Sequence, residues 1–192
     1  YSLPDSATAV ANASEAVRTG ATSIAVFTAT VNAAQATTLE ALNATGTYNI
    51  ADTAEPLSAA DADALTDTNV GTVSLTDAGT VTQTAAALAK IFGAGGYSAA
   101  NYIIADSAAN VIAAQDTLQG FAQSVSLTGN TTVAELASVK AIEAMGPVSS
   151  YNLADTAANI AGAAGAVLND ATNILATGVA TAAQALAIES AT

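Results

Sequence analysis

The stretch Tyr151-Asn152-Leu153-Ala154-Asp155-Thr156-Ala157 decides the fold, because similar stretches begin at Tyr1, Tyr48 and Tyr102. All four share the pattern Tyr-x-(Ile/Leu)-x-Asp-(Ser/Thr)-Ala, at spacings of 47, 54 and 49 residues. Recurrence at a nearly fixed period indicates a repeat architecture. We therefore predict a single repeat domain over residues 1–192. Its repeats are 1–47, 48–101 (with insertions, including one at 93–101), 102–150 and 151–192.

The start of each repeat predicts a strand followed by a helix. Its short alternation of apolar and polar residues is typical of a strand. The aspartate that follows is a preferred N-cap residue, since its carboxylate can accept the free N–H groups of a first helical turn. The sequence thus predicts helix caps at Asp5, Asp52, Asp106 and Asp155.

A second strand and helix are predicted halfway through each repeat. Runs such as Val125-Ser126-Leu127-Thr128 indicate the strand. Asn or Thr followed three residues later by Gln or Glu indicates a capping box at the start of the helix. The predicted caps of these helices are Asn32, Thr80, Thr132 and Thr181.

Four repeats of this kind give about eight strand–helix coils. Consecutive strands joined by helices form a parallel sheet with right-handed crossovers. We predict an α/β fold, an open right-handed β-α solenoid with one parallel sheet, similar to leucine-rich repeats in the length of its coil. The alternative is a closed (β/α)8 barrel, which typically needs about 250 residues and bulkier strands. The 52 alanines among 192 residues suit closely spaced coils.

Composition excludes several classes of function. The chain has 3 basic and 16 acidic residues, a net charge of −13, and neither His nor Cys. Nucleic-acid binding requires clustered Lys and Arg, so no nucleic-acid partner is expected. The sequence contains no uninterrupted apolar run of 18 residues, so no membrane insertion is expected. Zinc sites, thiol catalysis and Ser-His-Asp triads cannot be built without His or Cys, and we predict that the protein is not an enzyme.

One acidic stretch offers oxygen ligands for a hard cation. Asp61, Asp63 and Asp67 are the predicted ligands if Ca²⁺ binds this chain. An EF-hand loop starting at Asp61 would need Gly and Glu where Thr66 and Thr72 stand. The alternative interpretation is an exposed acidic helix end. No other cofactor is expected.

The repeats also resemble a known family. Tyr151–Ile160, together with 48–54 and 181–185, resembles the "DTAANI"-type repeats of very large secreted bacterial surface proteins, including RTX-type adhesins. The resemblance covers essentially the whole chain, although the glycine-rich Ca²⁺ nonapeptide of RTX proteins is not present in it. It implies an extracellular or cell-surface location and a structural or adhesive role, and it carries over no catalytic residues.

These observations favour a structural module of an extracellular assembly such as a filament, sheath, surface layer or adhesin stalk. Neither end of the sequence shows the atypical polar repeat that caps a free-standing solenoid. We therefore expect coils to stack end to end, on copies of this chain or on adjacent repeats of a longer one. The alternative is an adhesion module whose sheet face binds a glycan or a protein.

Overall fold

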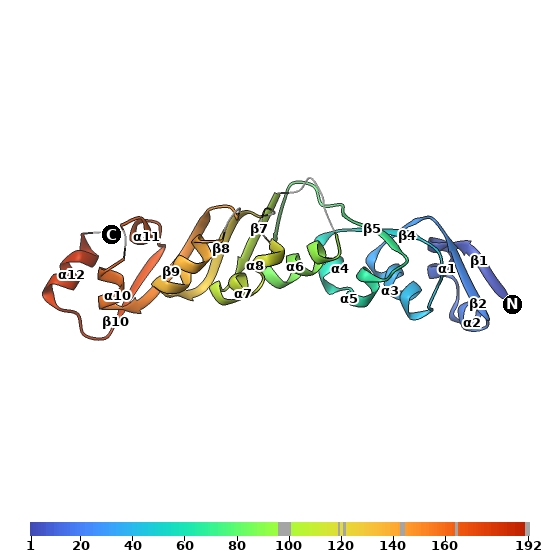
Figure 1. The fold of residues 1–192 in the computed structure, drawn as a ribbon, viewed down its shortest axis with the longest axis horizontal. Coiled ribbons are helices and arrows are strands. Elements are labelled where there is room, and N and C mark those ends of the chain that lie inside the picture. The colour runs from blue at the N-terminus through green and yellow to red at the C-terminus, as the bar shows by residue number, and fades with distance from the viewer. Residues whose placement is uncertain (96–100, 119, 121, 143–144, 164, 191–192) are drawn as a thin grey trace. The chain divides into compact units, whose positions relative to one another are not determined.

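The computed structural model describes residues 1–95, 101–118, 120, 122–142, 145–163 and 165–190. Within these residues, ten strands and twelve short helices alternate along an α/β chain (Figure 1). Part of the predicted insertion, at 96–100, lies outside the described residues.

The chain divides into two compact units. The first contains Tyr1–Val81 and Ala87–Ala100, and the second contains Thr82–Ala86 and Asn101–Thr192. The single domain of four repeats stays a prediction.

The first unit consists of parallel strand pairs and the helices between them. Its elements are β1 (Ser2–Ser6), α1 (Ala7–Asn12), α2 (Glu15–Thr19), β2 (Ser23–Phe27), β3 (Thr30–Val31), α3 (Ala33–Ala41), β4 (Tyr48–Asp52), α4 (Ala54–Ala59), α5 (Ala62–Thr66) and β5 (Val70–Leu75). One parallel sheet pairs β1 with β2 and another has the order β3-β4-β5. A single parallel bridge joins Ala25 of β2 to Thr45. The predicted single sheet is thus interrupted, because the chain turns at 28–29 between β2 and β3.

The second unit is built around a five-stranded sheet. Its order is β10-β9-β8-β7-β6, and the pairs β7–β8, β8–β9 and β9–β10 are parallel. The elements from β7 onward are β7 (Asn101–Asp106), α7 (Ala108–Ala113), α8 (Gln115–Leu118), β8 (Ala122–Thr131), α9 (Val133–Lys140), β9 (Val148–Thr156), α10 (Ala157–Ala161), α11 (Gly165–Asn169), β10 (Asn173–Thr177) and α12 (Ala182–Glu189). Two further elements, β6 (Thr80–Gln83) and α6 (Ala85–Gly93), contain the boundary between the units. None of the described sheets closes into a barrel, so the alternative of a (β/α)8 barrel is wrong for the described residues.

The core of each unit lies between one face of its strands and the helices. Inner strands bury the apolar residue two positions after the motif tyrosine: Ile50 and Ile104 are 0% exposed and Leu153 is 1% exposed. Paired residues of neighbouring strands lie between 19 and 24 positions apart, as in Val31 opposite Ile50 and Ile104 opposite Val125. We call each such strand, with the helices that follow it, a segment.

The motif strands are followed by two short helices where the sequence predicts one. After β9, for example, α10 and α11 are separate. The same division occurs between α1 and α2 and between α4 and α5, where Ser14 and Asp61 are the N-caps of the second helix. A polar N-cap residue inside the predicted helix favours a new start, since it competes with the continuing backbone hydrogen bonds.

Candidate functional site

The helices after the motif strands begin one residue later than predicted. Their N-cap residues are Ser6, Thr53, Ser107 and Thr156. The prediction that Asp5, Asp52, Asp106 and Asp155 occupy this position is therefore wrong. A short hydroxyl reaches the third N–H of its own helix, as Ser107 Oγ accepts from Asn110 N and Thr156 Oγ1 accepts from Asn159 N. The Ser or Thr that follows each aspartate was the visible signal for this.

The motif aspartates instead bind backbone N–H groups, and three of them do so across two segments. Their Oδ1 atoms accept the N–H of the next residue, at 2.7–2.8 Å in all four. The Oδ2 atoms of three of them accept the first N–H of the helix in the preceding segment. These bonds are Asp52 with Ala33 N (3.1 Å), Asp106 with Ala85 N (3.0 Å) and Asp155 with Val133 N (3.1 Å). A carboxylate is favourable there, because the first helical N–H groups have no partner within the helix and carry partial positive charge.

Two asparagines hold this arrangement in the second unit. Asn110 Nδ2 donates to Asp106 Oδ1 at 2.7 Å, and Asn159 Nδ2 donates to Asp155 Oδ1 at 2.8 Å. The Asn159 bond, followed by the backbone bonds from Thr156 and Val133, lowers the pKa of Asp155 below its ordinary value of 3.8. The contact therefore favours the ionised carboxylate.

Asp77, which the sequence did not predict, also binds the start of a helix in the preceding segment. Asp77 Oδ2 accepts the first N–H of α4, from Ala54, at 2.8 Å. Asp77 lies in the turn between β5 and β6, outside the repeated motif. Its only signal was an aspartate two residues before Gly79, whose φ of +89° marks a tight turn.

The second set of predicted caps is confirmed at three positions. Asn32, Thr132 and Thr181 each form a complete capping box at the start of α3, α9 and α12. The cap predicted at Thr80 is wrong, because Thr80 lies in β6 and α6 begins at Ala85. The stretch 80–83 alternates exposed and covered residues and is rich in Thr and Val, which favours a strand over a helix start.

All three basic side chains bind protein groups. Arg18 Nη1 donates to Ala11 O in α1 at 2.7 Å. Lys90 Nζ donates to Ser58 O at 2.9 Å and also to Ala60 O, at the end of α4. Cations suit these positions, since the last carbonyls of a helix lack intrahelical donors.

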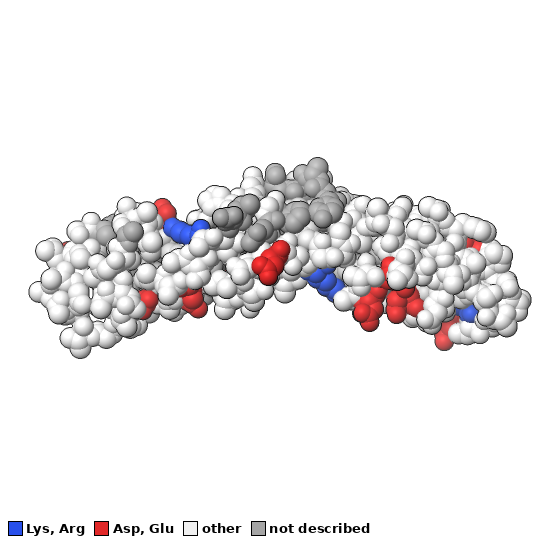
Figure 2. All heavy atoms as spheres, viewed as in Figure 1, with Lys and Arg blue, Asp and Glu red and all other residues white. Residues whose placement is uncertain are grey.

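The face drawn in Figure 2 carries few charged groups.

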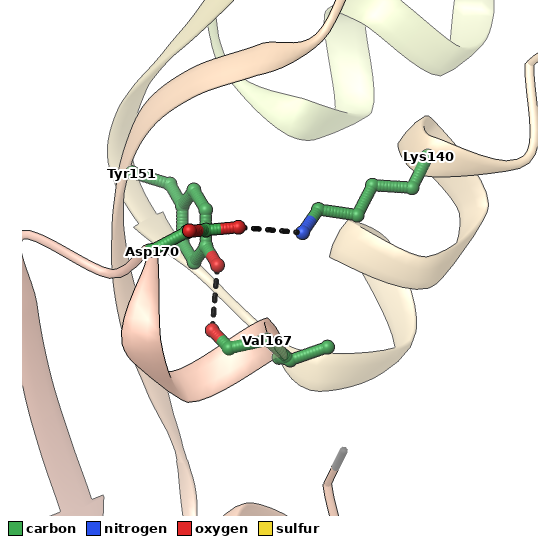
Figure 3. Close-up of polar contacts among 4 residues, drawn as sticks. All are labelled: Lys140, Tyr151, Val167 and Asp170. Carbon is green, nitrogen blue, oxygen red and sulfur yellow. Dashed lines mark hydrogen bonds and ion pairs between the residues drawn. The ribbon is translucent and has the colours of Figure 1, made fainter. Parts of the chain in front are cut away.

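Lys140 is part of a cluster around Tyr151 (Figure 3). Lys140 Nζ lies 3.6 Å from Asp170 Oδ2 and 5.4 Å from the Tyr151 ring centroid. The Tyr151 hydroxyl donates to Val167 O at 2.5 Å. Burial, with a further contribution from Asp170, raises the pKa of Tyr151. Beside the cluster is a hollow of about 320 Å³, lined by both Lys140 and Asp170. The one acidic residue that lines it, Asp170, is ion-paired with Lys140.

Tyr48 occupies the equivalent position in the second repeat but is arranged differently. It is 1% exposed, and its hydroxyl has no hydrogen-bond partner among the described residues. Burial first, then Asp67 and Glu40, raises its pKa to about 12. The Tyr1 hydroxyl, by contrast, donates to Val17 O. Tyr48 and Tyr151 are thus buried packing residues, and of Tyr1, Tyr48 and Tyr151 only Tyr48 has a hydroxyl without a described partner.

Two of the three carboxylates in the acidic stretch accept backbone hydrogen bonds. Asp61 Oδ1 accepts the N–H of Asp63 at 3.1 Å as the cap of α5, and Asp67 Oδ1 accepts the N–H of Asn69 at 2.6 Å. Among the described residues, no group of three or more acidic side chains is placed to hold a metal ion. The interpretation of Asp61, Asp63 and Asp67 as Ca²⁺ ligands is therefore not supported. Nor does any described helix have the length and apolar character needed to cross a bilayer.

Large exposed apolar side chains lie toward the two ends of the chain. Among the described residues they are Tyr1, Val17, Phe27, Leu175, Val179 and Leu186, with exposures between 40% and 97%. The motif tyrosine shows the contrast: Tyr1 is 60% exposed, whereas its three counterparts are at most 4% exposed. The first segment therefore lacks the cover that inner segments have.

The last segment shows the same lack of cover. The fourth residue of the inner helices α3, α6 and α9 is fully buried as Ala36, Leu88 and Leu136. Its counterpart in α12, Ala185, is exposed, and so is the first helical residue, Ala182. No residue of α12 is buried. Positions that form the core elsewhere are thus at the surface at both ends, which makes these two surfaces the candidate functional site.

Comparison with protein-family models, with curated proteins and with solved structures finds no match to this chain.

Proposed function

We propose that this chain is a structural module of an extracellular bacterial assembly. In this proposal its segments are coils of an open right-handed solenoid, and the solenoid extends by end-to-end stacking of one chain on another. The observation that supports it most directly is that core positions such as Tyr1 and Ala185 are exposed at the two ends. The extracellular location is inferred from the resemblance of the repeats to those of secreted surface proteins.

The physical drive for stacking is the apolar surface that the end segments leave in water. Burying a large apolar side chain is worth about 1.5–3 kcal/mol. An edge strand such as β1 or β10 also leaves backbone N–H and C=O groups unpaired, and such edges attract further strands. Because the two end surfaces differ, the contact is heterologous, and a heterologous contact that does not close into a ring produces open-ended growth.

The first experiment measures the association of the purified chain. Sedimentation velocity over a concentration series, with electron microscopy of the same samples, should show linear oligomers that lengthen with concentration. A monodisperse monomer at every concentration would overturn the proposal.

A pair of variants in α12 separates specific stacking from nonspecific aggregation. Ala185→Glu puts a charge at the position that inner helices bury, so it should abolish association. Ala183→Glu makes the same change at the second helical position, which is exposed in α12 and also in α3, α6 and α9 as Ala34, Ala86 and Ala134. It should associate like the unmodified chain. Both sites are exposed in the isolated chain, so both variants should fold. Equal association by the two variants would contradict stacking through this surface.

A further inference from the structure

The junctions inside the chain define how one segment meets the next. In the first unit, Thr30 pairs with Asn49 and Val31 with Ile50. In the second, Asn130 pairs with Asn152 and Thr131 with Leu153. In both junctions, the residue just before the helix cap therefore lies opposite the residue two positions after the motif tyrosine. The two junctions share one register although their side chains differ.

The two ends of the chain carry the unpaired halves of such a junction. The helix cap of the last segment is Thr181, so the residues before it are Val179 and Ala180. They form no strand and pair with none of the described strands, and Val179 is 97% exposed. Ser2 and Leu3, at the outer edge of β1, follow the motif tyrosine in the positions of Asn49 and Ile50.

The first and last segments also contain a hydrogen-bond acceptor and a donor that have no partner among the described residues. Three motif aspartates accept the first N–H of a preceding helix through Oδ2. Asp5 Oδ1 accepts the N–H of Ser6, while no described residue donates to its Oδ2. The first N–H of α12, from Ala182, has no acceptor among the described residues. The free carboxylate oxygen and the free N–H match the pair that is made three times within the chain.

We propose that a second copy of this chain binds the last segment in the register of the internal junctions. Strand β1 of the second copy lies parallel to Val179 and Ala180, with Ser2 opposite Val179 and Leu3 opposite Ala180. Its Asp5 Oδ2 accepts the hydrogen bond of Ala182 N. This inference rests on the proposed function and adds the residue contacts and the register. The chosen occupant is a second copy because the chain's own first segment supplies the acceptor, the edge strand and the uncovered apolar residues that the last segment lacks.

Disulfide cross-linking tests the register. Because the chain contains no cysteine, only the introduced cysteines can form a disulfide. Ser2→Cys and Val179→Cys are prepared as two separate variants, mixed, and oxidised. Directly opposed strand residues fall within the Cα separation of 4.4–6.8 Å that a disulfide tolerates. A cross-linked heterodimer is expected on non-reducing gels. Pro4→Cys mixed with Val179→Cys is the matched control: it lies two residues off register, beyond disulfide reach, and should give no heterodimer.

A charge-matched pair of variants tests the hydrogen bond. Asp5→Asn retains an oxygen for the Ser6 N–H but loses the second carboxylate oxygen. It should weaken association about tenfold, the size expected for one hydrogen bond to a charged group. Asp116→Asn removes the same charge from an exposed residue of α8 and should not weaken association. Circular dichroism of both variants is the control for folding, and both should keep the helix content of the unmodified chain.

The outcomes distinguish this inference from the function on which it rests. A chain that stays monomeric at all concentrations overturns both. A chain that associates, but gives as much heterodimer with Pro4→Cys as with Ser2→Cys, overturns the register. Association of Asp5→Asn with the affinity of Asp116→Asn overturns the hydrogen bond. In those two cases end-to-end stacking survives with different contacts.

Discussion

At the scale of single residues, the motif aspartates differ from ordinary helix caps, because three of them bind a helix of the preceding segment. Asp155 accepts hydrogen bonds from Thr156, Asn159 and, across the segment junction, Val133. Asp155→Asn places an amide N–H₂ where one of these donors points, so the melting temperature should fall in thermal denaturation at pH 7. Asp116→Asn removes an exposed carboxylate in the first turn of α8 that accepts no hydrogen bond among the described residues, so it should lower the melting temperature less.

The effect of Asp155→Asn should depend on pH with a definite sign. The pKa of Asp155 in the folded chain is below its ordinary value of 3.8. A lowered carboxyl pKa gives stability that is fully present above the unfolded value and is lost as the pH falls through the folded one. The melting-temperature difference should therefore stay constant between neutral pH and about pH 5 and shrink below pH 3.8. A difference that persists in stronger acid would contradict this role of the carboxylate.

The tyrosines offer a second comparison between equivalent residues. Tyr151→Phe removes a hydroxyl that donates to Val167 O, and it should lower the free energy of unfolding by about 1 kcal/mol. Tyr48→Phe removes a buried hydroxyl that has no partner among the described residues, so stability at neutral pH should be unchanged or higher. Urea denaturation of both variants checks the contrast, and equal losses would contradict it.

The stabilities of the unmodified chain and of Tyr48→Phe should also differ in their dependence on alkaline pH. Because the pKa of Tyr48 is raised from 10.0 to about 12 in the folded chain, its contribution to stability declines as the pH rises from 10 toward 12. Tyr48→Phe should escape that decline. A stability profile for this variant that follows the unmodified chain above pH 10 would exclude the buried hydroxyl as its source.

At the scale of elements, close backbone approach sets the distance between neighbouring segments. A Cβ added at Gly146 would lie 1.9 Å from Gln123 O in β8. Gly146→Ala must therefore push β8 away from the chain before β9, and we expect it to cost roughly 2–3 kcal/mol in urea denaturation. Gly93→Ala, where a Cβ meets nothing within 4 Å, should be neutral or slightly stabilising. Similar losses in both variants would contradict a steric origin.

The sequence predicted the elements better than their contacts. Strand and helix alternation and the capping boxes at Asn32, Thr132 and Thr181 follow from local patterns and are confirmed. The sequence predicts the wrong helix for the aspartates, because a one-dimensional pattern shows that a carboxylate lies near a helix start but not which helix it contacts. The cap at Thr80 failed because the strand tendency of 80–83 outweighs a Thr-x-x-Gln match. The sequence does not predict which end positions are exposed, since Ala185 follows the same Ala-Ala-Gln stretch as buried Ala36.

At the scale of the whole molecule, charge opposes the association that we propose. Each chain carries a net charge of −13 with only 3 basic residues. Screening shortens the range of the repulsion from about 30 Å at 0.01 M salt to about 8 Å at 0.15 M. Association should therefore strengthen several-fold over this range in sedimentation experiments, with Ala185→Glu as the monomeric control for salt effects on sedimentation. Weaker association at the higher salt would indicate that attraction between charges holds the chains together.

The aspartates that span two segments also bear on which changes of chain length should be tolerated. Asp106 and Asp155 each serve a helix that lies before their own strand. Duplicating or deleting a stretch of about 49 residues keeps every carboxylate beside a helix start of the right kind. Duplicating one segment alone would place two motif strands in succession and break the alternation. We therefore expect an engineered insertion or deletion of one such stretch to preserve the contacts of Asp106 and Asp155 better than one of half that length.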